Sequence, residues 1–202
     1  VSGLLVLTSL TNLPNQIALV VISTRPPTNI TWAGAVGNNW DTNIGSNWLN
    51  GAGLDRFYPL DGVTFTNSTV TNLNLVGSLS PASVAVDATV SYSFGGSGSI
   101  GGTSGLTKMN TGTLTMLTTN TYSGSTVISG GVLNVSFLAN GGTLSAIGAS
   151  GSNPTNLVLD GGKLRYTGIT VVTDRGATFG SGGGAIEVTS SSASLSQSGT
   201  LQ

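Results

Sequence analysis

The stretch that decides the fold runs from Gly105 to Val135 and reads GLTKMNTGTLTMLTTNTYSGSTVISGGVLNV. Short runs of apolar, strand-favouring residues alternate in it with Thr, Ser and Asn, and turns containing Gly or Asn interrupt these runs every few residues. Alternation with a period of two is typical of a strand that buries one face. The stretch therefore predicts short strands joined by tight corners, as in a coil that stacks on further coils.

The same pattern continues on both sides of this stretch. Alternating apolar pairs such as Leu164 and Tyr166 recur along the chain, and glycine pairs such as Gly161-Gly162 lie between them. Glycine supplies the positive φ angle that a sharp corner needs. No window shows a sustained apolar period of 3.6 residues, so the sequence predicts an all-β chain.

Many short strands with glycine corners fit a β-sandwich, a β-barrel or a parallel β-helix. Strand–corner–strand units recur, such as STVISGGVLNV and LVLDGGKLRY, and Asn, Thr and Ser lie where ladders of like side chains would form between coils. A sandwich would more often need longer crossovers and more charged outer faces. We therefore expect a right-handed parallel β-helix (β-solenoid), with a β-sandwich as the alternative.

Composition narrows the possible partners. Only 6% of the 202 residues are charged, against roughly 25% in an average soluble protein. The six Lys and Arg residues are scattered singly and form no stripe that could neutralise phosphates, so we expect no nucleic-acid partner. The longest apolar runs, such as Ile17 to Ile22, are far shorter than the roughly 20 residues of a membrane helix, so we expect no membrane insertion by this segment.

The chain has no Cys and no His. Disulfides, thiolate nucleophiles, His-based catalytic triads and the usual zinc sites are therefore excluded. Its seven acidic residues show no obvious pair of the kind that glycoside hydrolysis requires. We expect no enzyme activity, no cofactor, no metal site and no catalytic residue.

The chain divides into three parts. Residues 1–27 read as strands that end in a connection, because Pro26-Pro27 cannot lie in a central strand. Residues 28–66 carry all three tryptophans, spaced by eight, and are expected to brace the rod where the chain enters it. Residues 67–202 show the strand-and-corner pattern throughout and are expected to form the coils.

The ordered pieces of the opening stretch resemble a known family, the autotransporter-associated β-strand repeat, also called the passenger-associated transport repeat. The pieces that match are Gly105 to Lys108, Gly112 to Met116, Asn120 to Gly124, Thr126 to Ile128, and Gly131 to Val135. The resemblance implies a secreted bacterial β-helix protein, located outside the cell or on its surface.

Two flanking segments, Thr31 to Phe65 and Thr173 to Gly199, are similar to sequence that accompanies this repeat in large secreted proteins. The chain starts at Val1 without Met or a signal peptide and stops at Gln202 within a predicted strand, so we expect a processed product or a segment of something longer.

A stacked coil leaves unpaired strand edges only at its two ends, and such an edge is a template for another chain. Neither end of this sequence looks like a polar cap. We expect an extracellular structural rod, a stalk or fibre segment of a bacterial surface protein. It would continue into more repeats, self-associate end to end, or support adhesion.

The alternative function is a carbohydrate-binding, or failing that carbohydrate-cleaving, surface protein whose ligand is a surface glycan. Trp32, Trp40 and Trp48 would offer aromatic faces to sugar rings, with Asp41 and Asp61 binding hydroxyls. The competing interpretation places the tryptophans in the core, because each buries a large apolar area.

A second candidate ligand site is the corner that contains Asp160, Lys163 and Arg165. Alternation puts Lys163 and Arg165 on one outward face, where they could bind an acidic polysaccharide. The competing interpretation is a solvated outer face with a corner aspartate. Two neighbouring pairs, Asp174-Arg175 and Asp55-Arg56, are expected to be ion pairs at the surface or in turns.

Overall fold

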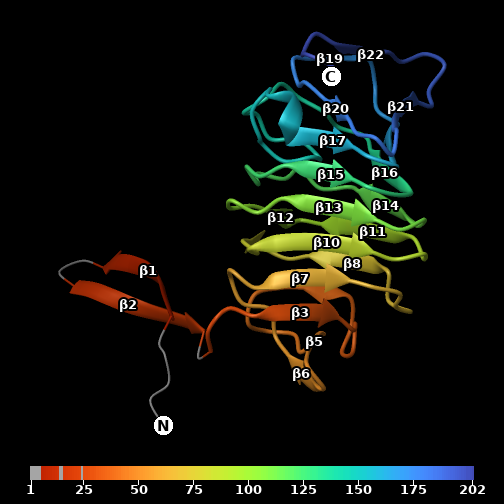
Figure 1. Ribbon diagram of the computed structural model, residues 1–202. Coiled ribbons are helices and arrows are strands. Elements are labelled where there is room, and N and C mark those ends of the chain that lie inside the picture. The colour runs from red at the N-terminus through yellow and green to blue at the C-terminus, as the bar shows by residue number, and fades with distance from the viewer. Residues whose placement is uncertain (1–5, 14–15, 24) are drawn as a thin grey trace.

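The computed structural model describes residues 6–13, 16–23 and 25–202, and side chains from residue 25 onward. The first strands, β1 (Val6–Leu13) and β2 (Gln16–Ser23), pair antiparallel with each other. From residue 29 the chain winds into a stack of coils (Figure 1). The described residues contain no α-helix, and their one helical turn is the 3₁₀ element η1 (Pro154–Asn156).

Two sheets form the main walls of the stack. The parallel strands of the first wall are β3 (Asn29–Trp32), β7 (Gly62–Phe65), β10 (Ser83–Asp87), β13 (Leu106–Met109), β15 (Thr126–Ile128), β17 (Leu157–Leu159) and β20 (Thr178–Phe179). The strands of the second wall are β4 (Asn39–Trp40), β8 (Asn72–Leu75), β11 (Tyr92–Gly96), β14 (Thr113–Met116), β16 (Val132–Val135), β18 (Lys163–Tyr166) and β21 (Ala185–Val188).

Shorter ladders complete the coils. Two are parallel, β9 (Ser78–Leu79) with β12 (Ser99–Ile100) and β19 (Val171–Thr173) with β22 (Leu195–Gln197). At the lower end, β5 (Trp48–Asn50) and β6 (Gly53–Asp55) add antiparallel to β3.

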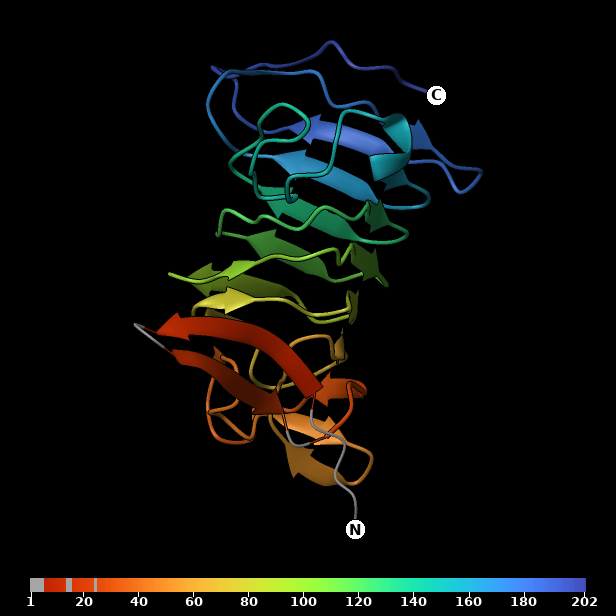
Figure 2. The same cartoon turned by 90° about the vertical axis from the view of Figure 1, so that its left-hand side faces the viewer.

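The path of the chain is a right-handed solenoid. In Figure 1 the first-wall strands run from left to right at the front, the chain returns behind them, and each coil lies above the one before it. Figure 2 shows the same stack from the side. Successive strands of each wall pair in parallel, which confirms the predicted β-helix and excludes the β-sandwich, whose sheets would be antiparallel.

The core is a set of stacked rows of inward-pointing side chains. On the second wall, Leu114 pairs in register with Leu133, and Leu133 with Leu164. All three are buried, with at most 1% of their surface exposed. Since alternate residues of a strand point to opposite faces, the period-two pattern of the sequence produces these rows directly.

The lower end of the stack is closed by the tryptophan-rich segment. Residues 28–66 supply the first rung of both walls, because β3 pairs in parallel with β7 and β4 with β8. The hairpin of β5 and β6 then covers the edge of β3. This antiparallel hairpin is a cap on the first wall, within the segment that the sequence predicted to brace the rod.

The last described rung of the second wall is less covered than the rungs below it. Ile186 and Val188 continue the core rows, since they pair in register with Leu164 and Tyr166. Yet Val188 is 36% exposed, whereas Tyr166, one rung lower, is 1% exposed. The core stripe therefore reaches the surface at the last rung of the second wall.

Candidate functional site

The three tryptophans lie inside the first coils and do not form a ligand platform. Trp32 is 2% exposed, and Trp40 and Trp48 are fully buried. Their rings meet edge to face, with centroids 5.1 Å apart for Trp32 and Trp48 and 5.5 Å apart for Trp40 and Trp48. A ring that stacks on a sugar needs one face open to solvent, and these rings have none. The tryptophans belong to the aromatic core, where Phe57 and Phe65 pack against them.

The two aspartates expected beside the tryptophans stabilise backbone. The Asp41 carboxylate accepts the Gly45 N–H at 2.8 Å, and Asp61 is fully buried, where it accepts the N–H groups of Thr28 and Tyr58. Both oxygens of Asp61 also bind Arg25. Neither carboxylate is thus aimed at a ligand in solvent.

The predicted ion pair between Asp55 and Arg56 is wrong. Asp55 instead pairs with Arg25, whose Nε lies 2.8 Å from Asp55 Oδ2, while Arg56 contributes its backbone N–H. Burial alone would raise the pKa of Asp55, but hydrogen bonds from the Arg56 N–H, Asn50 and Arg25 hold that pKa below its usual range. Neighbours in the sequence do not identify this ion pair, because Arg25, the partner of Asp55, is 30 residues away along the chain.

The Asp160 corner brings two of its three predicted residues together. Lys163 and Arg165 point outward from β18, as alternation predicts, and both contact Glu187 on β21, at 3.4 and 2.7 Å. Asp160 is exposed and accepts the Gly182 N–H at 2.6 Å. The arrangement is an outer-face ion cluster beside a capped corner.

The sequence analysis did not single out Glu187, which lies on β21 directly after the glycines at 182–184. Hydrogen bonds from Arg165 lower the pKa of Glu187 despite the opposing effect of desolvation, and Lys163 adds to this. Its partners could have been found by aligning the glycine clusters at 161–162 and 182–184, which sets Arg165 opposite Glu187.

Arg175 is buried, so the predicted surface pair of Asp174 and Arg175 is also wrong. Only 3% of Arg175 is exposed. Its guanidinium donates to backbone carbonyls of one long loop, namely those of Ala139, Thr143, Gly148 and Ser150. Burial lowers the pKa of Arg175, against the effects of Tyr122 and Asp174. The side chain holds this loop against the coil.

The stretch around Asn120 is organised by buried polar groups. Asn120 Oδ1 accepts the Ile100 N–H at 2.9 Å and the Thr118 hydroxyl at 3.2 Å, and Nδ2 donates to the carbonyls of Thr118 and Ala146. The amide thus joins the coil below to the loop above. Every donor and acceptor of this buried side chain is used, which favours a fixed structural role.

Lys108 occupies a core row of the first wall, in register with Val86 below and Ile128 above. It is 1% exposed, and its ammonium donates to the carbonyls of Met109 and Asn110 at 2.6 and 2.8 Å. A third carbonyl, that of Gly130, lies at 3.3 Å. The lysine therefore closes the corners of two successive coils.

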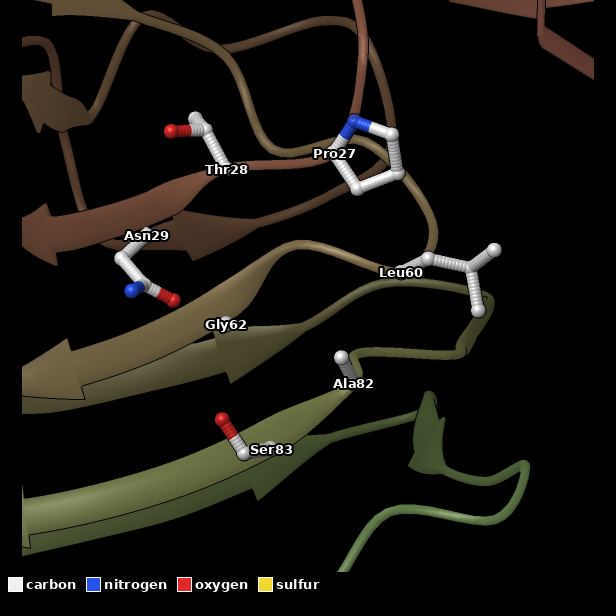
Figure 3. A pocket seen from close by; sticks show the side chains of 7 residues that line it. All are labelled: Pro27, Thr28, Asn29, Leu60, Gly62, Ala82 and Ser83. Carbon is white, nitrogen blue, oxygen red and sulfur yellow. The ribbon is translucent and has the colours of Figure 1, made fainter.

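A shallow groove of about 340 Å³ lies on the side of the first coils (Figure 3). Three stacked strands form it, with Asn29 on β3, Gly62 on β7 and Ser83 on β10 in one register row. Its remaining lining residues are Pro27, Thr28, Leu60 and Ala82. No charged side chain lines it.

The described part of the chain contains neither a cluster of metal-ligating side chains nor a membrane-spanning helix. Nowhere in residues 25–202 do three acidic side chains gather as they would around a metal ion. The described residues likewise include no helix of the length and apolarity that crossing a membrane demands.

Comparison with known proteins matches residues 106–135 to the family model described as passenger-associated-transport-repeat. These residues match the passenger-associated transport repeat that the sequence resembles. The chain is also 50% identical, over 103 residues, to the adhesin BmaC autotransporter of Brucella suis biovar 1 (strain 1330). The aligned region is 50% of this chain and 3% of that protein, so the chain spans a small part of its relative's length. No solved structure matches the chain.

The passenger-associated transport repeat coincides with β13 to β16 and the corners between them. Its characteristic Lys108, Asn120 and Tyr122 are all buried, and the Tyr122 hydroxyl lies 2.8 Å from the Thr126 hydroxyl. The motif residues therefore hold one rung of the solenoid to the next, and the resemblance predicted from the sequence is confirmed.

Proposed function

We propose that this chain is part of an extracellular bacterial surface protein, in which the solenoid is a structural rod or stalk that supports adhesion. The observation that carries the proposal is the burial of the repeat's polar side chains between rungs. Similarity to an adhesin autotransporter supports the surface location and the adhesive role. The similarity to an adhesin also supports a non-enzymatic role.

The adhesive part of the proposal is tested by display. The chain would be fused to an inert outer-membrane anchor on a non-adherent bacterium, and binding to epithelial cells and to immobilised matrix proteins would be counted. We expect adherence above that of the anchor alone, and its loss in an Asn120→Ala variant that disrupts the repeat. Equal adherence of the anchor alone and the fusion would refute the adhesive role. The structural role as a rod would not be affected.

The partly exposed Val188 supports a second element of this proposal, namely that a further rung stacks on β21. At this end of the core stripe Val188 is 36% exposed and Ile186 is half-buried, while the lower end carries the cap of β5 and β6. A parallel rung with apolar residues at alternate positions would bury this stripe as each coil buries the one below it. A second copy that packs its own Val188 against this end would also cover the stripe, which would give a dimer joined through the upper ends.

Sedimentation velocity over a range of concentrations tests this stacking. We expect a concentration-dependent dimer that Val188→Lys abolishes, with Val36→Lys, at an exposed site on the capped end, as the matched control. A strict monomer at high concentration would refute association of two copies through the upper ends. Ordered fibres of the parent would show that the lower end associates as well, which would contradict a dimer joined only through the upper ends.

A further inference from the structure

The groove formed by Asn29, Gly62 and Ser83 exists because Gly62 has no side chain. A Cβ atom at this position would collide with Asn29 Oδ1 and lie 3.1 Å from Ser83 Oγ. Gly62 does not have a positive φ angle, so its backbone conformation does not require glycine. Glycine at this position therefore leaves room for the hollow, and its backbone conformation would accept any residue.

Two polar side chains converge on this hollow without partners. Figure 3 shows the Asn29 amide directed down from β3 and the Ser83 hydroxyl directed up from β10, on either side of Gly62. Neither side chain makes a hydrogen bond within the described part of the chain. Both side chains are exposed, whereas Asn47 and Asn120, which bind backbone groups with both ends of the amide, are buried. Asn29 and Ser83 are therefore available to a ligand.

The rim of the groove is apolar. Pro27, Leu60 and Ala82 are exposed, and Leu60 has a φ of 70°, a conformation that a bulky residue rarely adopts. The Leu60 N–H donates to the Ser80 carbonyl, and the next residue, Asp61, is fixed by its own hydrogen bonds to Thr28 and Tyr58. Surrounding contacts thus impose this conformation, as they often do at functional positions.

The groove is electrically neutral. Asp61 lies directly behind it, but both of its carboxylate oxygens bind Arg25, and they also accept backbone N–H groups. The backbone of β7 pairs with β3 on one side and β10 on the other, so a peptide has no strand edge to join. The groove therefore suits a small neutral ligand that carries both hydroxyls and an aliphatic face.

We propose that this groove binds a neutral pyranose unit of a glycan. Sugar hydroxyls would hydrogen-bond to the Asn29 amide and the Ser83 hydroxyl, and a C–H face of the ring would pack on Pro27, Leu60 and Ala82. The inference rests on the proposed adhesive function, for which it names a ligand class. The site is separate from the tryptophans and from the Asp160 corner.

Ligand-observed saturation-transfer NMR on the whole chain tests this site. The probes are methyl pyranosides of glucose, galactose, mannose and N-acetylglucosamine, with glucuronate and glucosamine as charged comparisons. The variants are Gly62→Ala, which fills the floor, and the double change Asn29→Ala with Ser83→Ala. The matched control is Ser125→Ala, because Ser125 lies on the same outward row two coils further along.

We expect saturation transfer from the parent to at least one neutral pyranoside, and binding about tenfold weaker in both groove variants. The Ser125→Ala variant should bind as the parent does. Absence of binding to every neutral probe, binding to the charged sugars alone, or unchanged binding by the double variant would overturn the assignment. Circular dichroism confirms folding of each variant, and the adherence experiment reports on the rod independently.

Discussion

Arg25 and Asp61 form a bidentate ion pair in which Nη1–Oδ1 and Nη2–Oδ2 are both 2.8 Å apart. The Arg25 guanidinium also lies 4.9 Å from the centre of the Tyr58 ring. Asp61 is fully buried and precedes the first position of β7, while Arg25 comes directly before Pro26-Pro27. The pair therefore anchors the connection that leads from β2 into the first rung.

Replacement of Asp61 by Asn should weaken this anchor. The substitution leaves the Arg25 guanidinium without its buried counter-charge, and we expect the free energy of unfolding to fall by about 3 kcal/mol. Urea denaturation, monitored by tryptophan fluorescence, measures this free energy of unfolding. Asp160→Asn is the control, because the exposed Asp160 accepts one N–H that an asparagine oxygen can also accept. Equal midpoints for the two variants would show that the anchor adds little stability.

Removal of the Asn120 side chain should destabilise the repeat. Asn120→Ala leaves the buried Ile100 N–H and Ala146 carbonyl without partners, so we expect a loss of about 3 kcal/mol in unfolding free energy. Asn134→Ala is the matched control, since Asn134 Oδ1 is buried and has no hydrogen-bond partner. That change should be neutral or slightly stabilising. A control that costs as much as Asn120→Ala would contradict this account.

The fold could be predicted because its determinants are local. Alternation fixes which side chains of a strand point inward, and glycine pairs mark the corners, so a segment such as LVLDGGKLRY describes two strands and the turn between them without reference to the rest of the chain. The right-handed parallel stack follows once such units repeat.

The interior positions of the charged residues were harder to predict. Lys108 is in phase with Leu106, so alternation points it inward, while its charge suggests the surface. Its long aliphatic stem resolves the conflict, because it crosses the core row and delivers the ammonium to carbonyls at the corner. Arg175 was misjudged for another reason, since its acceptors belong to a loop whose length no strand period determines.

We expect position 124 to require glycine, because neighbouring rungs lie too close together there for a side chain. A Cβ atom on Gly124 would collide with the Ser104 carbonyl oxygen of the coil below, although the φ angle of Gly124 is not positive. We expect Gly124→Ala to lower the unfolding free energy by about 2 kcal/mol. In the control Gly53→Ala, the new Cβ meets nothing nearer than the Asn50 carbonyl at 3.9 Å. A thermal melt in which both variants behave alike would rule out the steric explanation.

Because Lys108 is buried, it should make the free energy of unfolding depend on pH. Desolvation lowers the pKa of Lys108 to about 8, with Asp87 opposing the shift. Below pH 8 the lysine is protonated in both the folded and the unfolded chain. Between pH 8 and the ordinary lysine pKa of about 10.4, the unfolded chain binds more protons than the folded chain. Stability contributed by this group therefore rises with pH across that window.

A comparison of the parent with Lys108→Met isolates this effect. Burial raises the pKa of Tyr122, and this phenol makes stability fall with pH above about 10, but both proteins share it. We expect the parent to gain about 2 kcal/mol relative to the variant between pH 7 and pH 9.5, measured by urea unfolding. A flat difference would mean that the carbonyls of Met109, Asn110 and Gly130 stabilise the ammonium enough to offset its burial.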